Sequence, residues 1–326
     1  MKVFVTGATG FLGSVLVKHL LSDDVQIRAI KRKQSSLDLL GSLADKIEWL
    51  EGDVEDIDSL IVGLKGTEGV YHCAAYLGFD GITSLERLNS VNVDGTSNVV
   101  NACLEYPGIR MLHVSSIAAL GRSDNTVGEL NESTEWKNSS LNTAYAISKH
   151  RAEMAVFRGV AEGLEAIVVN PSLVMGPGRK GENTMQIAER LKAGSIPFIP
   201  TGGTNVVDVE DVALGAIAAF KSGKSGHRYV LSGHNMTWHQ IMSHLAEALN
   251  VKVPSRSVSP RILTSFACAA EAWATISRSK PLITREAARL SSSLTYYSNE
   301  KAKTELGYTS RPFEDTASRI AAALNT

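Results

Sequence analysis

The first 170 residues alternate short apolar runs with longer segments in which apolar residues recur every three or four positions. The short runs predict buried β-strands, and the longer segments predict amphipathic helices. Because the two kinds of segment alternate, they indicate a parallel sheet with right-handed crossovers and helices on both faces. The expected strands cover residues 2–7, 25–30, 46–53, 69–75, 109–116 and 166–172. The expected helices cover residues 11–21, 57–64, 84–106 and 143–162.

Beyond residue 178 the pattern becomes less regular, and proline and glycine interrupt it. We therefore expect an α/β chain in two parts, a doubly wound Rossmann sheet over 1–175 and a smaller α/β lobe over 176–326, with some exchange of chain between them. Helices of the second part are expected at 182–193, 209–221, 237–249, 260–277 and 284–292, and a strand at 227–233.

Two segments suggest functional roles. The polar stretch 121–142 is longer than a simple connector, and its length is typical of a functional loop or lid. The helix expected over 260–277 places its apolar residues on one broad face, which either packs on the lobe or forms a pocket wall or interfacial surface for a lipid-like molecule. The residues expected on that face are Ile262, Leu263, Phe266, Ala269, Ala270, Trp273 and Ile276.

Composition excludes several classes of protein. The 326 residues contain 33 Lys and Arg against 34 Asp and Glu, so the chain lacks the basic excess of a general nucleic-acid binder. Its three cysteines form no CxxC pair, which favours a reducing compartment. We expect no signal peptide, because the apolar segment at residues 3–5 is short, and no membrane span, because no apolar run reaches roughly 18 residues. We expect a cytoplasmic protein that binds no nucleic acid and does not insert stably into membranes.

A glycine-rich segment, Thr6 to Gly13 (TGATGFLG), lies between the first expected strand and the first expected helix. In this context, glycines permit a tight turn, close approach of the backbone to a pyrophosphate, and tight helix–strand packing. The amino end of the helix then presents unpaired N–H groups to the phosphates. The alternative is an ordinary glycine-bearing turn, since the spacing is GxxGxxG and not GxGxxG. The position directly after the first strand favours a dinucleotide site.

The end of the second expected strand bears on the choice of coenzyme. NAD-binding sheets usually carry an acidic residue there for the ribose hydroxyls, whereas this chain has Lys31, Arg32 and Lys33. A guanidinium binds a 2′-phosphate through two hydrogen bonds, and a carboxylate would repel it. The alternative is a solvated basic turn. We expect NADP(H) to be favoured, with NAD(H) as the second candidate.

Tyr145 and Lys149 form a YxxxK pair on an expected helix, where the spacing of four places both side chains on one face. Ser115 and Ser116 follow an expected strand, at the edge where open α/β sheets bind ligands. A tyrosine has a pKa near 10, and a lysine ammonium one turn away favours its phenolate. Tyr145 can then exchange a proton with a substrate oxygen that Ser116 hydrogen-bonds.

Taken alone, YxxxK often arises by chance, and Tyr145 would then be a half-buried helix tyrosine. Here the pair follows the glycine-rich segment, Asp53 in EGDV, the CAA sequence at 73–75 and Asn92 in VNVDGT, in that order. With these motifs, the chain resembles the extended short-chain dehydrogenase/reductase superfamily over nearly its whole length. The resemblance implies a Rossmann domain that carries the catalytic residues, and a C-terminal lobe that binds the substrate.

The resemblance also implies residue roles. Ser116 is the substrate-binding serine, because Gly121 lies five residues beyond it as in the family pattern, and Ser115 lines the cofactor. Asn92 steadies Lys149 or an ordered water; otherwise it is simply a polar residue at the start of a helix.

Further implied roles concern the cofactor. Lys149 binds the nicotinamide ribose, Asp53 meets the adenine amino group, and Val54 packs on the adenine ring. The residues expected to contact the cofactor are Gly7, Thr9, Gly10, Phe11, Leu12, Gly13, Arg32, Lys33, Asp53, Val54, Ala74, Ala75, Ser115, Tyr145, Lys149 and Pro171.

The segment 163–178 is similar to the branch of dihydroflavonol reductases and hydroxysteroid dehydrogenases, and Val168 to Pro171 stand where nucleotide-sugar epimerases typically carry an RYFN-like sequence. We therefore expect an NAD(P)H-dependent oxidoreductase that interconverts a carbonyl and an alcohol on a fairly apolar small molecule. Two alternatives stay open, a nucleotide-sugar epimerase or dehydratase with tightly bound NAD, and a non-enzymatic NADPH-sensing module. The intact Ser116, Tyr145 and Lys149 argue against the sensor.

The resemblance further implies pairing into a homodimer. We expect no metal site, because His234, His239 and His244 are five residues apart, which is the wrong phase for one helix face.

Overall fold

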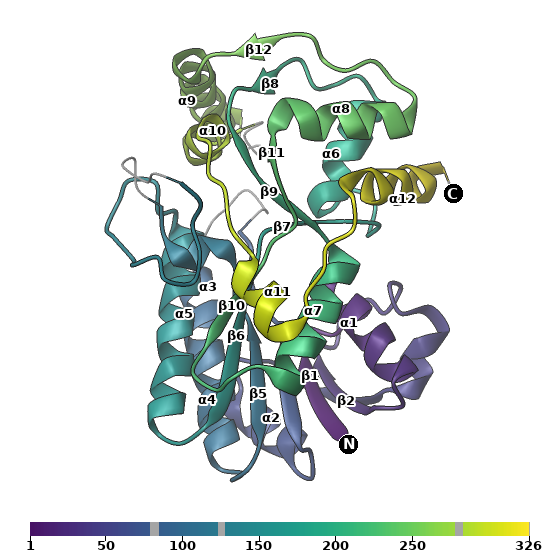
Figure 1. Ribbon diagram of the computed structural model, residues 1–326, viewed down its shortest axis with the longest axis vertical. Coiled ribbons are helices and arrows are strands. Elements are labelled where there is room, and N and C mark those ends of the chain that lie inside the picture. The colour runs from purple at the N-terminus through teal and green to yellow at the C-terminus, as the bar shows by residue number, and fades with distance from the viewer. Residues whose placement is uncertain (79–84, 123–127, 278–282, 326) are drawn as a thin grey trace.

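A seven-stranded parallel sheet forms the centre of the larger part of the molecule (Figure 1). The computed structural model describes residues 1–78, 85–122, 128–277 and 283–325. The strand order is β10-β6-β5-β4-β1-β2-β3, so the order reverses direction between β1 and β4. The strands are β1 (Lys2–Thr6), β2 (Gln26–Lys31), β3 (Glu48–Glu51), β4 (Gly69–His72), β5 (Arg110–Val114), β6 (Glu165–Pro171) and β10 (Arg228–Leu231).

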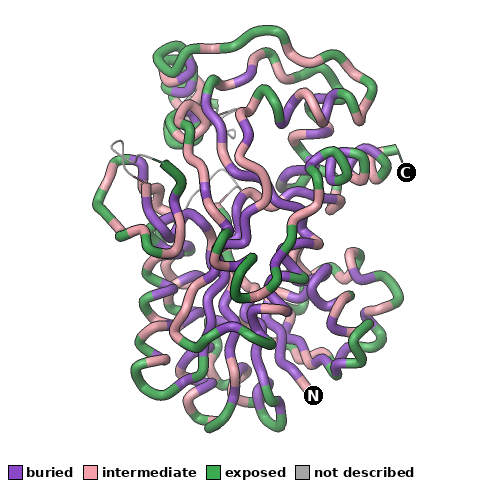
Figure 2. The backbone as a smooth tube through the Cα atoms, viewed as in Figure 1, coloured by how far each residue is buried: buried purple, intermediate pink, exposed green. Residues whose placement is uncertain are grey.

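Helices cover both faces of this sheet, as the alternation of apolar runs predicts. One face packs against α1 (Phe11–Ser22) and α7 (Val209–Ser222), and the other against α2 (Ile57–Leu64), α4 (Gly95–Leu104) and α5 (Ala144–Ala161). Figure 2 shows the buried strands between the partly exposed helices. Strands buried on both faces explain why their sequences are continuous apolar runs. The Rossmann prediction is therefore confirmed.

The helix expected over 84–106 departs from a single regular helix. From Leu85 onward it consists of α3 (Leu85–Leu88), a π-helical turn (Asn89–Asp94) and α4; Ser84 lies outside the described residues. Isolated π-helical turns occur often at functional sites, because they re-aim side chains within a helix. Here the turn contains Asn92, one of the predicted site residues.

The C-terminal lobe has its own core. Strands β7, β9 and β11 form one small sheet, β8 and β12 pair separately, and α6, α8 and α12 pack around an apolar cluster that includes Met175, Leu245 and Phe313. The strands are β7 (Leu173–Met175), β8 (Ile199–Pro200), β9 (Gly203–Asp208), β11 (His234–Thr237) and β12 (Ser257–Val258). The helices are α6 (Asn183–Lys192), α8 (Trp238–Leu249), α9 (Pro260–Ser277), α10 (Arg285–Ser292), α11 (Glu300–Leu306) and α12 (Phe313–Asn325).

The two parts are not divided at a single point of the chain. Although α7 and β10 lie beyond residue 175, α7 packs on the Rossmann sheet and β10 extends it beside β6. A boundary near residue 175 therefore describes the change of pattern in the sequence, whereas the chain returns to the sheet for residues 209–231.

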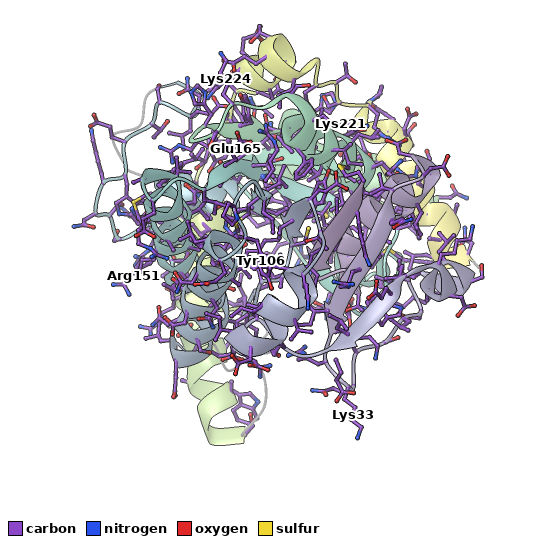
Figure 3. The ribbon with its side chains drawn as sticks, turned by 90° about the horizontal axis from the view of Figure 1, so that it is seen from below. Lys33, Tyr106, Arg151, Glu165, Lys221 and Lys224 are labelled. Carbon is purple, nitrogen blue, oxygen red and sulfur yellow. The ribbon has the colours of Figure 1, made fainter. Side chains whose placement is uncertain are left out.

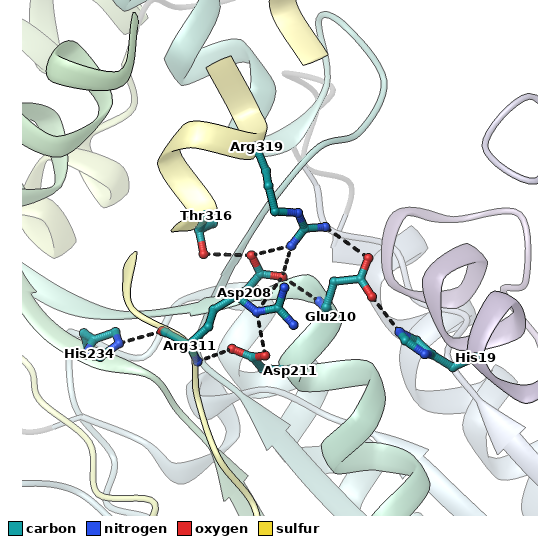
Figure 4. Close-up of polar contacts among 8 residues, drawn as sticks. All are labelled: His19, Asp208, Glu210, Asp211, His234, Arg311, Thr316 and Arg319. Atoms are coloured by element: carbon teal, nitrogen blue, oxygen red, sulfur yellow. Dashed lines mark hydrogen bonds and ion pairs between the residues drawn. The ribbon is translucent and has the colours of Figure 1, made fainter. Parts of the chain in front are cut away.

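A buried cluster of charges joins α7 to the lobe (Figure 4). Asp208 caps α7 by accepting a hydrogen bond from the Glu210 N–H at 2.8 Å. Its carboxylate also accepts two hydrogen bonds from Arg319 of α12, both at 2.9 Å, and one from the Thr316 hydroxyl at 2.7 Å. The nearby Asp211 accepts from Arg311 Nε at 2.8 Å. Asp208 thus fixes the start of α7 and the position of α12 together.

The face expected on the 260–277 helix is split in the structure. Leu263 and Ala267 are buried in a small cluster with α10, whereas Ile262, Phe266 and Trp273 are exposed by 63%, 42% and 68%. The packing alternative therefore holds for Leu263 and Ala267 only, because α10 covers one part of the apolar surface of the helix and leaves the rest exposed. Within the described residues, no helix combines the length and apolar character that a membrane span requires.

Candidate active site

Tyr145 and Lys149 lie on α5 close to the carboxyl end of β5. The helix starts at this point because the Thr143 side chain caps it, accepting a hydrogen bond from the Ala146 N–H at 3.0 Å. Lys149 is 1% exposed, and its Nζ donates to the Val114 carbonyl at 2.9 Å. That bond fixes the ammonium at the carboxyl end of the strand.

Ser116 is the second residue after β5 and lies beside Tyr145. It caps the short 3-10 helix Ile117–Leu120, accepting a hydrogen bond from the Ala118 N–H at 3.1 Å. Burial raises the pKa of Tyr145 to about 12, and the hydrogen-bonding Ser116 hydroxyl opposes the rise. Burial thus opposes the phenolate in the protein alone, whereas the expectation that Lys149 favours it refers to a site that also holds an oxidised, positively charged nicotinamide. Ser116, Tyr145 and Lys149 nevertheless gather at one edge of the sheet.

Burial also shapes the charge of the lysine. It lowers the pKa of Lys149 to about 8, while the Glu153 carboxylate acts in the opposite direction. Two histidines nearby, on β4 and β5, are uncharged at neutral pH, because burial lowers the pKa of His72 to about 3 and that of His113 well below its usual value. Burial raises the pKa of the Cys73 thiol to about 12. The lysine is therefore the positively charged group at this point of the sheet.

Asn92 connects α5 to the segment that follows β4. Its Oδ1 accepts from the Tyr76 N–H at 2.7 Å, and its Nδ2 donates to the Tyr76 carbonyl at 2.9 Å and to the Ser148 hydroxyl at 3.0 Å. The resemblance implied that Asn92 steadies Lys149 or an ordered water, and the structure places it against Ser148, the residue before Lys149 on α5. Asn92 thus links the segment after β4, through Tyr76, to α5, through Ser148.

The glycine-rich segment forms a tight turn at the carboxyl end of β1, next to the point where the strand order reverses. Gly7 has φ of +72°, and a Cβ at this position would lie 2.6 Å from the Ala74 N. A Cβ at Gly13 would lie 2.1 Å from the Gly7 carbonyl oxygen. These two glycines therefore allow close packing of turn, strand and helix. Gly10 occupies the N-cap of α1, where, among described residues, no side chain caps the helix.

The amino end of α1 fits the phosphates of a dinucleotide, because its N–H groups lie uncapped at the ligand-binding edge of the sheet. Thr9, Phe11 and Leu12 complete this turn. Phe11 packs toward the loop after β7, since a Cβ at Gly178 would lie 3.1 Å from its ring.

The predicted adenosine end of the site lies after β2 and β3. Arg32 Nε is 3.9 Å from a carboxylate oxygen of Asp53, so these two predicted residues are neighbours in space. Lys33 is exposed, and Figure 3 shows it projecting from the molecule. Val54 is only 5% exposed and packs among core residues. Arg32 and Asp53 therefore lie together at the edge of the sheet where the adenosine end of the coenzyme is predicted.

The remaining predicted residues lie along the same edge. Ala74 and Ala75 follow β4, and the Ala74 N–H donates to the Thr6 hydroxyl at 3.3 Å. Ser115 is buried after β5, and Pro171 ends β6. The structure thus brings residues from six strands, β1 to β6, to one edge of the sheet.

Sequence reasoning missed a second group of polar residues. Glu153, Asn170 and Arg228 form a buried network one helical turn beyond Lys149. Glu153 could have been found from its spacing of four after Lys149, which places it on the same helix face. Arg179 was also missed: it donates to Asp38 Oδ1 at 2.8 Å through Nε and to the Thr9 carbonyl at 3.0 Å.

A doubly wound sheet with a glycine turn at its topological switch point, and a serine, tyrosine and lysine at the adjoining strand end, defines an NAD(P)-dependent enzyme of the extended short-chain dehydrogenase/reductase type. The chain belongs to the NAD-dependent epimerase/dehydratase family, whose model matches residues 3–232.

Several proteins are similar along most of the chain. A protein of Synechocystis sp. named as a dihydroflavonol 4-reductase is 35% identical over 312 residues, which cover 93% of this chain and 89% of the relative. Sterol demethylase protein B of Methylococcus capsulatus is 32% identical over 274 residues, covering 82% and 80%. Among solved structures, the crystal structure of gox2253 matches with a TM-score of 0.84 and 33% identity, covering 99% of this chain and 97% of that one.

Proposed function

We propose that this enzyme reduces a carbonyl group on a fairly apolar small molecule to an alcohol, with NADPH as the preferred coenzyme. The observation that carries the proposal is the gathering of Ser116, Tyr145 and Lys149 at the carboxyl end of β5, at the same sheet edge as the glycine turn. The names of the relatives support a reductase, since the first is called a dihydroflavonol 4-reductase.

When bound, the nicotinamide coenzyme supplies the hydride to the carbonyl carbon. Ser116 donates a hydrogen bond to the substrate oxygen and holds the carbonyl in position. Tyr145 gives its phenolic proton to the same oxygen as negative charge develops there. The phenolate that remains is stabilised by the ammonium of Lys149, which binds the nicotinamide ribose and is fixed by the Val114 carbonyl.

The arginine after β2 supports the choice of coenzyme. Arg32 is exposed enough to meet a 2′-phosphate, with a side chain 52% accessible. A guanidinium pairs with a phosphate through two charge-assisted hydrogen bonds. The contact with Asp53 keeps Arg32 near the predicted adenosine end of the site. A 2′-phosphate bound there would share the Arg32 guanidinium with the Asp53 carboxylate.

Replacing Tyr145 with phenylalanine tests the chemistry. Because Tyr145→Phe removes the proton donor and keeps the ring, we expect kcat for NADPH-linked reduction to fall about 10²- to 10⁴-fold with little change in NADPH affinity. The matched control is Tyr106→Phe, which removes a hydroxyl that donates to the Ile61 carbonyl, away from this edge. Turnover in Tyr145→Phe equal to that of the control would contradict the mechanism.

A substrate panel tests the reaction class. NADPH consumption is measured with aldehydes, ketones, sterol ketones and nucleotide sugars, and we expect turnover with apolar carbonyl compounds. The purified protein is also denatured and its released nucleotides are analysed. Stoichiometric bound NAD with activity on nucleotide sugars alone would favour the epimerase or dehydratase alternative. NADPH binding without turnover of any class of substrate would favour the sensing module.

A further inference from the structure

The Glu153 carboxylate is completely buried, one helical turn beyond Lys149 on α5. Its Oε1 accepts a hydrogen bond from Asn170 Nδ2 on β6 at 2.5 Å, and its Oε2 lies 3.3 Å from Arg228 Nη1 on β10. A buried carboxylate is costly unless it is paired and hydrogen-bonded. This one is held by groups from two neighbouring strands, so its position is fixed with respect to the sheet.

Arg228 reaches Glu153 from a distant part of the chain. Its strand, β10, pairs with β6, and the register places Arg228 opposite Val168. The same guanidinium donates to the Glu132 carbonyl at 3.2 Å, which ties the polar stretch 121–142, described except for residues 123–127, to the network. The arginine is therefore anchored on several sides and points one of its N–H groups at Glu153.

Among the described residues around Lys149, Glu153 is the acidic group that can balance the charge of the ammonium. Besides Glu153, the titratable groups facing it among the described residues are His72 on β4, Cys73 after β4 and His113 on β5. The two histidines are neutral and the thiol is protonated at neutral pH, as derived above. Burial raises the pKa of the Glu153 carboxyl, and the charges of Arg228 and Lys149 oppose that rise. Glu153 is thus the carboxylate that faces Lys149, and Arg228 is the cation paired with that carboxylate.

We infer that Glu153 is a positioning residue whose buried carboxylate keeps the Lys149 ammonium charged, while Asn170 and Arg228 hold that carboxylate in place. This inference rests on the proposed function, in which Lys149 acts as a cation. Two cations and one anion leave a net positive charge at this edge of the sheet. The charged Lys149 then donates charge-assisted hydrogen bonds to the ribose hydroxyls, which an uncharged lysine would not do.

The pH dependence of NADPH binding tests the inference without any substrate. Dissociation constants for wild type and Glu153→Gln are measured by NADPH fluorescence from pH 6 to pH 10. Since Glu153 opposes the effect of burial, its removal lowers the pKa of Lys149 below about 8. We expect the alkaline midpoint for loss of affinity to fall by about one pH unit. At pH 8 affinity should then weaken roughly fivefold.

The matched control is Glu162→Gln, which removes the same charge from the exposed end of α5, where Glu162 pairs with Arg158. We expect its midpoint to equal that of wild type. An unchanged midpoint in Glu153→Gln, or an equal displacement in both variants, would overturn the inference. A lower affinity at every pH with the same midpoint would indicate that Glu153 serves only packing, and would overturn it too.

Glu153→Asp provides the conservative variant, and it carries the test if Glu153→Gln does not fold. It retains the charge, so we expect a midpoint within about half a pH unit of wild type; a fall of a full unit would overturn the inference. The outcome is separable from the proposed function. If the midpoints behave as expected while wild type reduces no carbonyl compound, the role of Glu153 stands and the proposed reaction fails.

Discussion

Gly7 adopts a backbone conformation that residues with side chains rarely take, and it does so in close contact with another backbone segment. Its φ is +72°, and an added Cβ would meet the Ala74 N at 2.6 Å and the Cys73 carbonyl carbon at 2.7 Å. Neither backbone atom can rotate away as a side chain would. The geometry of the turn therefore depends on glycine at this residue for two separate reasons, strain and space.

We expect Gly7→Ala to lower the free energy of unfolding by more than about 2 kcal/mol. Gly41 offers a matched control, because its φ of +54° is also left-handed but its Cβ would meet nothing within 4 Å. Gly41→Ala should cost about 1 kcal/mol, from strain alone. Denaturant unfolding of both variants measures the difference. Equal losses in the two variants would show that the contact with Ala74 contributes nothing.

At the scale of single residues, the sequence was sufficient to predict site residues that lie close together along the chain. The glycine spacing and the Tyr145–Lys149 spacing are readable because a turn or one helical face determines them. Glu153 and Arg228 are 75 residues apart, and only the pairing of β10 with β6 brings them together. The raised pKa of Tyr145 escaped for the same reason, since burial is a property of the folded chain.

At the scale of elements, periodicity located most of the longer helices and strands, whereas α11, α12 and the short strands of the lobe were not expected. The helices expected at 182–193, 209–221 and 237–249 match α6, α7 and α8 within one residue at each end. Strands such as β7 and β11 contain only three or four residues, which is too short for a visible alternation. Their strand conformation comes from pairing with β9, a contact between distant segments.

The Asp208 cluster gives a prediction about how these elements are joined. Asp208 is fully buried, and its carboxylate is bound by Arg319 and Thr316 of α12 and by the first turn of α7. Asp208→Ala removes the buried acceptor of the Thr316 hydroxyl and of Arg319 Nη1, and leaves Arg319 only its bond to Glu210, so we expect the free energy of unfolding to fall by about 3 kcal/mol. Glu162→Ala removes only an exposed pair and should cost less than about 1 kcal/mol. Similar unfolding midpoints for the two variants in urea would contradict this account.

At the scale of the whole molecule, the chain passes from sheet to lobe and back to the sheet. The C-terminal lobe is thereby fastened through β7, α7 and β10, three elements adjoining the edge that carries the predicted site. The amino-acid pattern could not place this return, because α7 and β10 resemble any other helix and strand in sequence. A ligand at this edge therefore binds where the sheet and the lobe are connected by several passages of the chain.

A ligand that binds only the folded protein stabilises the whole molecule, and this distinguishes the coenzymes. At 100 times its dissociation constant, NADPH should add about 2.7 kcal/mol to the free energy of unfolding, and NADH at the same concentration much less. If Arg32 binds the 2′-phosphate, Arg32→Ala should weaken the affinity for NADPH about tenfold. The stabilisation by the same NADPH concentration should then fall to about 1.4 kcal/mol. Lys46→Ala, which removes an exposed cation elsewhere, should retain the full effect. Thermal unfolding with each coenzyme measures these differences; equal stabilisation by NADH and NADPH, unchanged in Arg32→Ala, would rule out the proposed preference.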